Sequence, residues 1–270
     1  MTHWSAGAGH TDIGPRPQNQ DAFLSEGGVH VVADGMGGHA GGAEAAQAVV
    51  EAFRPLVGHD PVTPADVAGA VARARDLVDE VALQHGGYSG STLTGALAVE
   101  HDGDPWWLIV NVGDSRVYAI DGVAAHQITV DHSHVQELVD AGRLTPEQAQ
   151  WHPDRNLVTR AIGDGRDGFD GWLVRARPGL RLVLASDGLM KSVPDASIGE
   201  IAGRSGRPLE AAQVLVDHAI AEGTNDNVTV VVVDTLDAST ASESSGEPWV
   251  VWGEFLGDGD DSTTVERTGA

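Results

Sequence analysis

The chain has 270 residues, of which 41% are hydrophobic and 21% charged, so it is long enough to bury a core without disulfide bonds. It contains no cysteine, which excludes a disulfide scaffold, a thiolate zinc site and a cysteine nucleophile. Forty acidic residues against 16 Lys and Arg give a net charge of −24, and such a surface repels nucleic acid and anionic membranes.

The sequence of the first 234 residues contains short apolar runs, which predict strands, and capping signals, which predict helices. The runs are rich in Val and Leu and end at Asp, Gly or Asn, as buried strands do. In chain order the sequence predicts a strand over 29–33, helices over 41–57 and from 64 onward, a strand over 107–112, a short helix from 146, a strand over 181–185, a helix over 209–222 and a strand over 228–233. This mixture favours an α+β fold with packed sheets.

Two of the helices are predicted from their first residues. Thr63 precedes Pro64 and Asp66, which places a capping residue, a proline and an acidic residue at the three favoured positions. Thr145 and Gln148 have the spacing of a capping box.

The composition changes after residue 236, so we expect a folded domain over 1–236 and a tail over 237–270. The tail carries eight acidic residues and one arginine, which is typical of a solvated segment. Its apolar segment 248–255 is expected to dock on this domain or on a partner. Thr263 and Thr264 lie among acidic residues and are candidate phosphorylation sites, although plain solvated disorder is the stronger interpretation.

Neither a membrane span nor a secretory signal is visible. No apolar run approaches the roughly 18 residues that a span needs, and the N-terminal residues lack a basic region followed by an apolar one. The single lysine, Lys191, does not end a Gly-rich phosphate loop, which excludes a P-loop nucleotidase. We therefore expect a soluble, cytoplasmic protein with no nucleic-acid or membrane partner.

Four aspartates each lie at the end of an apolar strand and beside a Gly or Asn: Asp34, Asp114, Asp187 and Asp226. Carboxylates that converge repel one another unless a cation lies among them. Because the chain has no cysteine, the matching cations are Mg²⁺ or Mn²⁺, which prefer oxygen ligands. Each Asp-Gly pair alone is explained by a turn, but that explanation is weaker for all four together.

Seven motifs in order resemble those of the metal-dependent Ser/Thr protein phosphatases of the 2C type, in their bacterial form. The resemblance extends from about residue 3 to 234 and rests on residues 11–21, 34–39, 113–116, 129–133, 157–163, 186–189 and 225–230. It implies an α-β-β-α sandwich: two packed antiparallel β-sheets flanked by helices on both outer faces.

The resemblance also implies a metal centre. Asp34 would bridge two ions of Mn²⁺ or Mg²⁺, and Gly35 would offer its carbonyl oxygen. Asp187 and Asp226 would complete the shell of the first ion, and Asp114 with Asp187 would touch a weaker third ion. Two such ions about 3.5–4 Å apart lower the pKa of a bridging water, which would attack the phosphorus.

The activity implied by the resemblance is hydrolysis of phosphoserine and phosphothreonine in proteins. Arg16 would hold the substrate phosphate with two nitrogen atoms, which a lysine cannot do. The partners would be phosphorylated proteins, opposite a Ser/Thr kinase, and the protein would act as a monomer.

Three positions depart from the usual family pattern. Gln20 replaces a Glu that holds the second metal, so affinity for that ion is in question, and Gln20 and Asp21 are the candidate residues for its shell. Lys191 lies where several relatives have an Asp near the third metal, and its ammonium would either repel that ion or lie in water at the surface. Met36 replaces a His of animal relatives, as in bacterial members.

The sequence also allows functions other than a phosphatase. The alternative is a phosphatase-like regulatory or binding module whose catalysis is weak because of Gln20. A histidine zinc site, for which His132 is one candidate, is disfavoured because no HExxH helix is present. Residues 131–153 correspond to a variable flap that selects substrates, or else to a packed helical hairpin.

Overall fold

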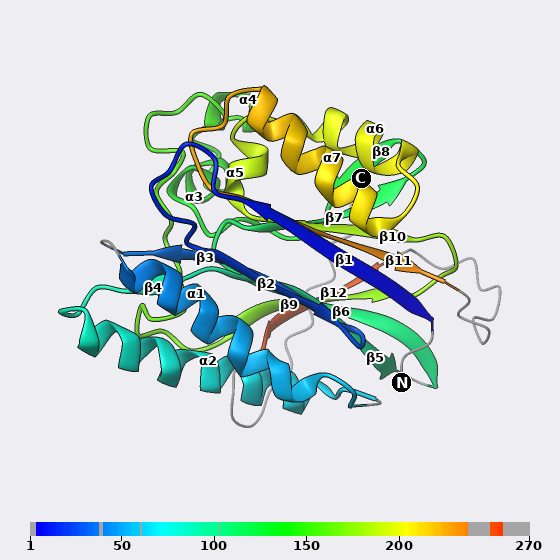
Figure 1. Cartoon of the computed structure of the whole chain (residues 1–270), viewed down its shortest axis with the longest axis horizontal. Coiled ribbons are helices and arrows are strands. Elements are labelled where there is room, and N and C mark those ends of the chain that lie inside the picture. The colour runs from blue at the N-terminus through cyan, green and yellow to red at the C-terminus, as the bar shows by residue number, and fades with distance from the viewer. Residues whose placement is uncertain (1–3, 38–39, 60, 102, 237–248, 256–270) are drawn as a thin grey trace.

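The computed structural model describes residues 4–37, 40–59, 61–101, 103–236 and 249–255. Its strands form two antiparallel sheets that pack face to face, and helices cover the outer face of each sheet (Figure 1). The predicted α-β-β-α sandwich is therefore confirmed.

The first sheet has the strand order β1-β11-β10-β7-β8, and every neighbouring pair is antiparallel. Helices α5 to α7 cover its outer face (Figure 1). The elements of this half are β1 (Ser5–Asp12), β7 (Arg116–Asp121), β8 (Ala124–Gln127), β10 (Arg181–Ala185), α5 (Asp187–Met190), α6 (Asp195–Arg204), α7 (Pro208–Ala221) and β11 (Val228–Thr235).

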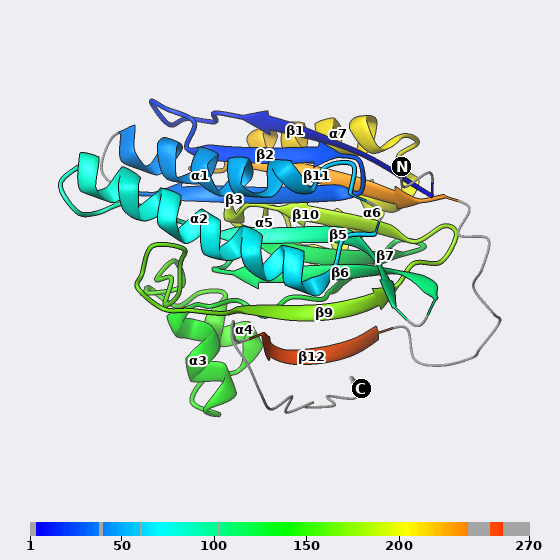
Figure 2. The ribbon, with the colours of Figure 1, turned by 90° about the horizontal axis from the view of Figure 1, so that it is seen from below.

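The second sheet has the order β12-β9-β6-β5-β3-β2, with β4 paired to the end of β3. Helices α1 and α2 cover its outer face, and α3 and α4 lie at one end of the sandwich (Figure 2). The elements of this half are β2 (Asp21–Glu26), β3 (Val29–Met36), α1 (Ala40–Phe53), η1 (Arg54–Leu56), α2 (Pro64–Gln84), β4 (Gly90–Ser91), β5 (Leu93–His101), β6 (Asp104–Val112), α3 (His134–Asp140), α4 (Pro146–Ala149), β9 (Phe169–Arg175) and β12 (Trp249–Phe255).

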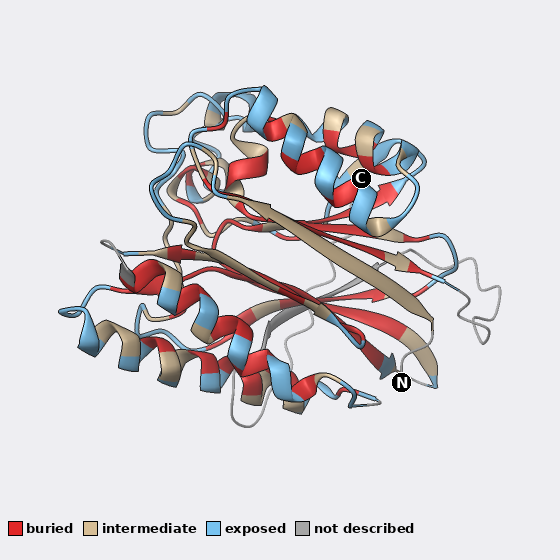
Figure 3. Ribbon diagram, viewed as in Figure 1, coloured by how far each residue is buried: buried red, intermediate tan, exposed pale blue. Residues whose placement is uncertain are grey.

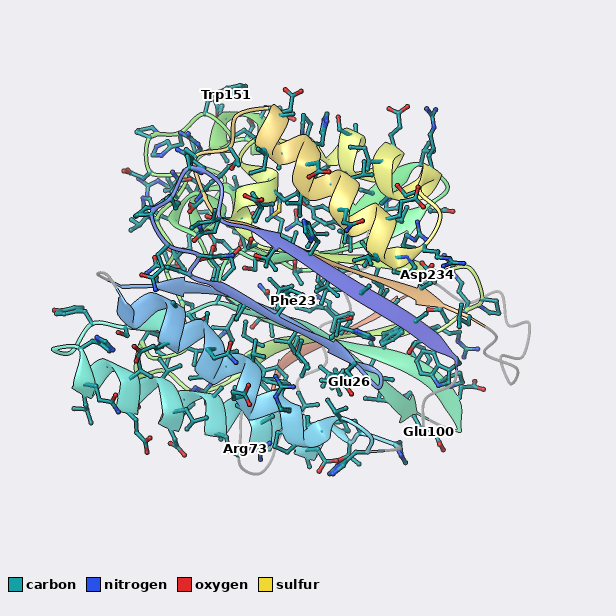
Figure 4. The ribbon with its side chains drawn as sticks, viewed as in Figure 1. Phe23, Glu26, Arg73, Glu100, Trp151 and Asp234 are labelled. Carbon is teal, nitrogen blue, oxygen red and sulfur yellow. The ribbon has the colours of Figure 1, made fainter. Side chains whose placement is uncertain are left out.

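Buried apolar residues form three layers, one between the sheets and one between each sheet and the helices on its outer face. Figure 3 shows the buried residues along the strands and on the inward sides of the helices. Successive side chains of a strand point to opposite faces, so a central strand serves two layers at once. In β11, Val231 and Val233 pack between the sheets, whereas Val230 and Val232 pack against the helices. This explains the unbroken run of valines. Phe23 also lies between the sheets (Figure 4).

The helix starts agree with their sequence signals, and one helix end does not. Thr63 and Thr145 each form the predicted capping box, at the starts of α2 and α4. The helix predicted over 41–57 ends at Phe53, and a 3₁₀ turn follows over Arg54–Leu56. Pro55 explains the difference, because it has no N–H to continue the α-helical hydrogen bonds.

Part of the predicted tail lies on the sheet. Strand β12, within the apolar segment 248–255, pairs antiparallel with β9, so that Trp249 lies opposite Val174 and Val251 opposite Trp172. The backbone of this segment thus pairs with a strand of this domain. Docking on this domain was one of the two expectations for the segment, and docking on a partner was the other. Thr263 and Thr264 lie outside the described residues. Among the described helices, none combines the length and the apolar character of a bilayer span.

One buried histidine makes stability depend on pH. His30 of β3 is 2% exposed, its Nδ1 bonds the Ser25 hydroxyl at 2.9 Å, and its ring lies 5.7 Å from the ring of Trp107. Burial lowers the pKa of His30 to about 3. Between that value and the unfolded value near 6.5, the unfolded chain binds a proton and the folded chain does not. The contribution of His30 is therefore fully present above pH 6.5 and is lost as the pH falls.

As the pH falls from 6.5 to 4, we expect His30 to lower the free energy of unfolding by about 3 kcal/mol. Urea unfolding in EDTA at both pH values should show a smaller loss for His30→Gln than for the unaltered chain. Equal losses in the two proteins would contradict the assignment.

Candidate active site

Five aspartates lie at the same end of the sandwich because the strands that carry them end there. Asp21 begins β2 and pairs directly with Asp34 of β3. Asp114 follows the end of β6, Asp187 follows the end of β10, and Asp226 precedes β11. The structure therefore brings together the four aspartates singled out in the sequence, with Asp21, the candidate for the second-metal shell, beside them.

The grouped carboxyl groups change one another's acidity. Burial, together with the charge of Asp187, raises the pKa of Asp21 to about 7. The same two causes raise the pKa of Asp114 to about 7. Burial and the charges of three neighbours raise the pKa of Asp34 well above its usual range. A cluster of this kind is stable in its ionised form only with a cation among its members.

Hydroxyl groups position two of these aspartates, one through its carboxylate and the other through its backbone. The Ser186 hydroxyl donates to Asp21 Oδ2 at 2.7 Å and accepts from the Thr229 backbone N–H at 2.9 Å. The Asp34 backbone N–H donates to Thr92 Oγ1 at 2.9 Å. Sequence reasoning missed these positioning residues. The one available signal was the Ser that directly precedes Asp187.

The donor atoms fit a hard divalent cation. Asp21 Oδ1 and Asp187 Oδ1 are buried and have no hydrogen-bond partner among the described residues, so each can bind an ion. Carboxylate oxygens are the ligands that Mg²⁺ and Mn²⁺ prefer. Within the described ranges, no three acidic or histidine side chains already surround one point as a finished coordination sphere. The nearest positive charge comes instead from the chain itself.

That charge belongs to Lys191, one helical turn after Asp187. Its Nζ lies 2.6 Å from Asp187 Oδ2 and 2.5 Å from Asp226 Oδ2, and its side chain is 18% exposed. Burial alone would lower the pKa of Lys191, but the two carboxylates outweigh burial and raise it. The expectation of a surface lysine with its head in water is wrong, because two acidic partners draw the ammonium inward.

Arg16 lies at the rim of the cluster. Its Nη2 contacts Asp226 Oδ2 at 2.9 Å, its Nε donates to the Asn225 carbonyl oxygen at 2.8 Å, and its side chain is 47% exposed. The guanidinium is thus held beside the carboxylates and remains open to solvent.

The loop that carries Arg16 is fastened by a buried asparagine. Asn227 Oδ1 accepts from the Gln20 backbone N–H at 2.9 Å, and its Nδ2 donates to the carbonyl oxygens of Ile13 and Gln18 at 2.8 and 3.0 Å. One side chain therefore fixes three points of the loop 13–20. Asn227 was visible in the sequence only as part of a motif.

Gln20 and Gly35 lie together near the C-terminal end of β3. The Gly35 N–H donates to the Gln20 carbonyl oxygen at 3.0 Å. A Cβ on Gly35 would collide with the carbonyl oxygen of Gly42, so only glycine fits there. A Cβ on Gly42 would in turn lie 2.6 Å from Gln20 Nε2, which places this amide beside the first residues of α1.

The predicted flap leaves the sandwich beside Asp114 and carries α3 and α4. His132 Nδ1 accepts from the Gly113 N–H at 2.9 Å, and its Nε2 lies 3.1 Å from Asp170 Oδ2. His132 is therefore a structural link between the flap and the turn before Asp114, not a metal ligand. Trp151, just after α4, is 84% exposed and points outward at the edge of the molecule (Figure 4).

Comparison with known proteins places this geometry in a family. The sequence matches protein phosphatase 2C over residues 7–218. The chain belongs to the protein phosphatase 2C family. It is 36% identical over 262 residues to the serine/threonine protein phosphatase PstP of Mycobacterium tuberculosis, a match that covers 94% of this chain and 48% of PstP. The chain thus spans about half the length of that relative.

Two further comparisons place this member of the protein phosphatase 2C family among bacterial proteins. It is 34% identical to the protein phosphatase PhpP of Streptococcus pneumoniae, over 83% of this chain and 94% of PhpP. The structure of the PstP catalytic domain in complex with two manganese ions matches with a TM-score of 0.77 and 34% identity, over 86% of this chain and 99% of that one.

Proposed function

We propose that this chain hydrolyses phosphoserine and phosphothreonine in proteins with the help of divalent cations. The observation that carries the proposal is the grouping of Asp34, Asp187 and Asp226 at one end of the sandwich, with the exposed guanidinium of Arg16 beside them. Phosphate-ester hydrolysis needs strong stabilisation of negative charge. The aspartates would supply it by holding cations, and Arg16 would supply it directly.

The cluster would hold two ions of Mn²⁺ or Mg²⁺. Asp34 would contact both ions, Asp187 and Asp226 the first, and Asp21, Gln20 and the Gly35 carbonyl oxygen the surroundings of the second. When bound, such ions supply an activated water and neutralise charge on the phosphate. Asp114 would face a third, weaker ion.

Arg16 would bind the substrate phosphate. Its fork of nitrogen atoms matches two phosphate oxygens, and Asn227 holds its loop in place before substrate arrives. Arg16 contacts Asp226 at the surface of the cluster. When a phosphate binds there, the guanidinium would exchange its carboxylate partner for a phosphate partner. The guanidinium then offsets part of the repulsion from a chain of net charge −24.

The test is hydrolysis of p-nitrophenyl phosphate and of a phosphothreonine peptide in Mn²⁺, in Mg²⁺ and in EDTA. We expect activity with either ion and none in EDTA. Equal turnover in EDTA would contradict the proposal. Binding of the phosphopeptide with negligible turnover at saturating Mn²⁺ would instead support the regulatory module, the second candidate, which the amide at Gln20 favours.

Gln20→Glu should tighten the requirement for metal. The substitution adds a negative charge beside Gly35 of β3, and a carboxylate attracts a divalent cation more strongly than an amide. We expect the Mn²⁺ concentration for half-maximal activity to fall about tenfold. An unchanged concentration would show that position 20 does not act on the metal.

The domain is proposed to extend over residues 1–236 and to work without the tail. Every family motif ends before residue 234, and the last strand of the first sheet ends at Thr235. A chain that ends at residue 236 should fold and keep its rate on p-nitrophenyl phosphate. Loss of folding, measured by thermal unfolding, would show that β12 is an integral strand of the sheet. A rate that changes several-fold in a folded chain would make the tail regulatory.

The partners proposed from the family resemblance are phosphoproteins whose phosphate is added by a Ser/Thr kinase. The negative surface supports the expectation that nucleic acid and anionic membranes are not partners. Action as a cytoplasmic monomer stays a prediction.

A further inference from the structure

The only lysine of the chain lies inside its acidic cluster. Lys191 Nζ contacts Asp187 Oδ2 at 2.6 Å and Asp226 Oδ2 at 2.5 Å. The other fifteen basic residues are arginines. An ammonium is a compact charge with rotatable donors, so it occupies a gap between two carboxylates much as a small ion does.

The backbone sets Lys191 in this position. Its N–H donates to the Asp187 carbonyl oxygen at 2.9 Å, which completes one helical turn and brings the two side chains to the same face. Asp226 reaches the same point from the loop before β11, where a carbonyl oxygen of Asn227 packs against Gly188. The three residues therefore meet because two separate backbone segments are in contact.

We propose that Lys191 is a resident cation of the metal centre: its ammonium holds Asp187 and Asp226 in the metal-free protein and competes with divalent ions for them. This inference rests on the proposed function, because it takes these two aspartates to be ligands of the first ion. It gives the chain a way to keep the cluster folded without metal.

The same charge affects a third ion. Lys191 acts electrostatically on Asp34 and Asp114 as well as on its two direct partners. A third ion between Asp114 and Asp187 would therefore approach a site that already contains a positive charge, and like charges repel. The inference predicts that the unaltered chain binds two Mn²⁺ ions at concentrations where Lys191→Asp binds three.

The single lysine allows a direct test on the unaltered chain. An amine-reactive label modifies Lys191 and the N-terminal amine, and mass spectrometry of peptides separates the two. We expect Lys191 to react slowly in EDTA and about tenfold faster in saturating Mn²⁺, because the ammonium then loses two carboxylate partners. The N-terminal amine, as an internal control, should react equally in both. A Lys191 rate that Mn²⁺ leaves unchanged would overturn the proposal.

A charge deletion supplies the second test. Calorimetric titration should show that Lys191→Met binds the first Mn²⁺ about tenfold more tightly, because its competitor is gone. In EDTA the same variant should unfold at a lower temperature than the unaltered chain. The matched control is Arg204→Met, which removes one positive charge from an exposed i,i+4 pair with Glu200. Equal or weaker Mn²⁺ binding by a folded Lys191→Met would contradict the proposal.

The outcomes separate this inference from the proposed function. If the unaltered chain fails to bind Mn²⁺ in calorimetry, the proposed metal centre is wrong. If Mn²⁺ binds and activates the unaltered chain while the reactivity of Lys191 stays constant, the metal centre stands and only the role of Lys191 is wrong.

Discussion

Asp34→Asn should abolish hydrolysis of p-nitrophenyl phosphate, with a loss of about a thousandfold or more. Asp34 pairs with Asp21 across the strands β2 and β3, and its charge also interacts with that of Asp187. It thus lies between the residues proposed for the two ions, so its carboxylate is the one proposed to contact both. An amide of the same shape keeps the backbone hydrogen bond to Thr92 but cannot supply that charge. Metal binding should weaken together with turnover.

The fold of Asp34→Asn should survive, because the substitution removes one of several carboxyl groups that repel one another. In EDTA we expect its unfolding temperature to equal or exceed that of the unaltered chain. The matched control is Asp217→Asn on the exposed side of α7, which should leave activity unchanged. Full activity in Asp34→Asn at any Mn²⁺ concentration would refute the proposed mechanism.

Gly188→Ala should have the second-largest effect, and it should act on the fold as well as on the metal centre. A Cβ at this position would collide with the carbonyl oxygen of Asn227. Because the obstacle is backbone, the two segments that carry Asp187 and Asp226 must move apart. We expect a loss of roughly 2–4 kcal/mol in the free energy of unfolding, and much weaker Mn²⁺ binding.

A glycine elsewhere provides the matched control for this substitution. Gly69 lies inside α2, where an added Cβ would meet only the end of the Arg73 side chain at 3.7 Å. Gly69→Ala should therefore stabilise the protein by up to about 1 kcal/mol, because alanine favours a helix interior. Urea unfolding and calorimetry with Mn²⁺ measure both effects. Wild-type stability in Gly188→Ala would show that the two segments are not held in contact.

The strands that were predictable from sequence are those with side chains buried on both faces. The valine run of β11 and the Leu-Val run of β10 serve two apolar layers and are therefore uniformly apolar. Strand β1 has small and polar residues and no such pattern. It becomes a strand because its backbone pairs with β11 over eight positions, which tertiary structure decides.

The members of the site were predictable from the sequence, but the contacts between its cations and its carboxylates were not. Asp34, Asp114, Asp187 and Asp226 are marked by their places at strand ends. The contact of Lys191 with Asp226 joins residues 35 positions apart, across two segments whose approach no local pattern encodes. The same is true of Asn227, whose partners Ile13 and Gln18 lie more than 200 residues away.

The acidic cluster also straddles the seam between the two sheets. Asp21 and Asp34 belong to the second sheet, whereas Ser186, which bonds Asp21, follows a strand of the first. At the far end of the seam, Trp107 Nε1 of the second sheet donates to Thr235 Oγ1 of the first at 2.9 Å. The spacing between the two sheets therefore sets the distance between the carboxylates that the two sheets carry. Substitutions that change the side-chain volume between the sheets should therefore change the affinity for metal, even when they leave every aspartate of the cluster unaltered.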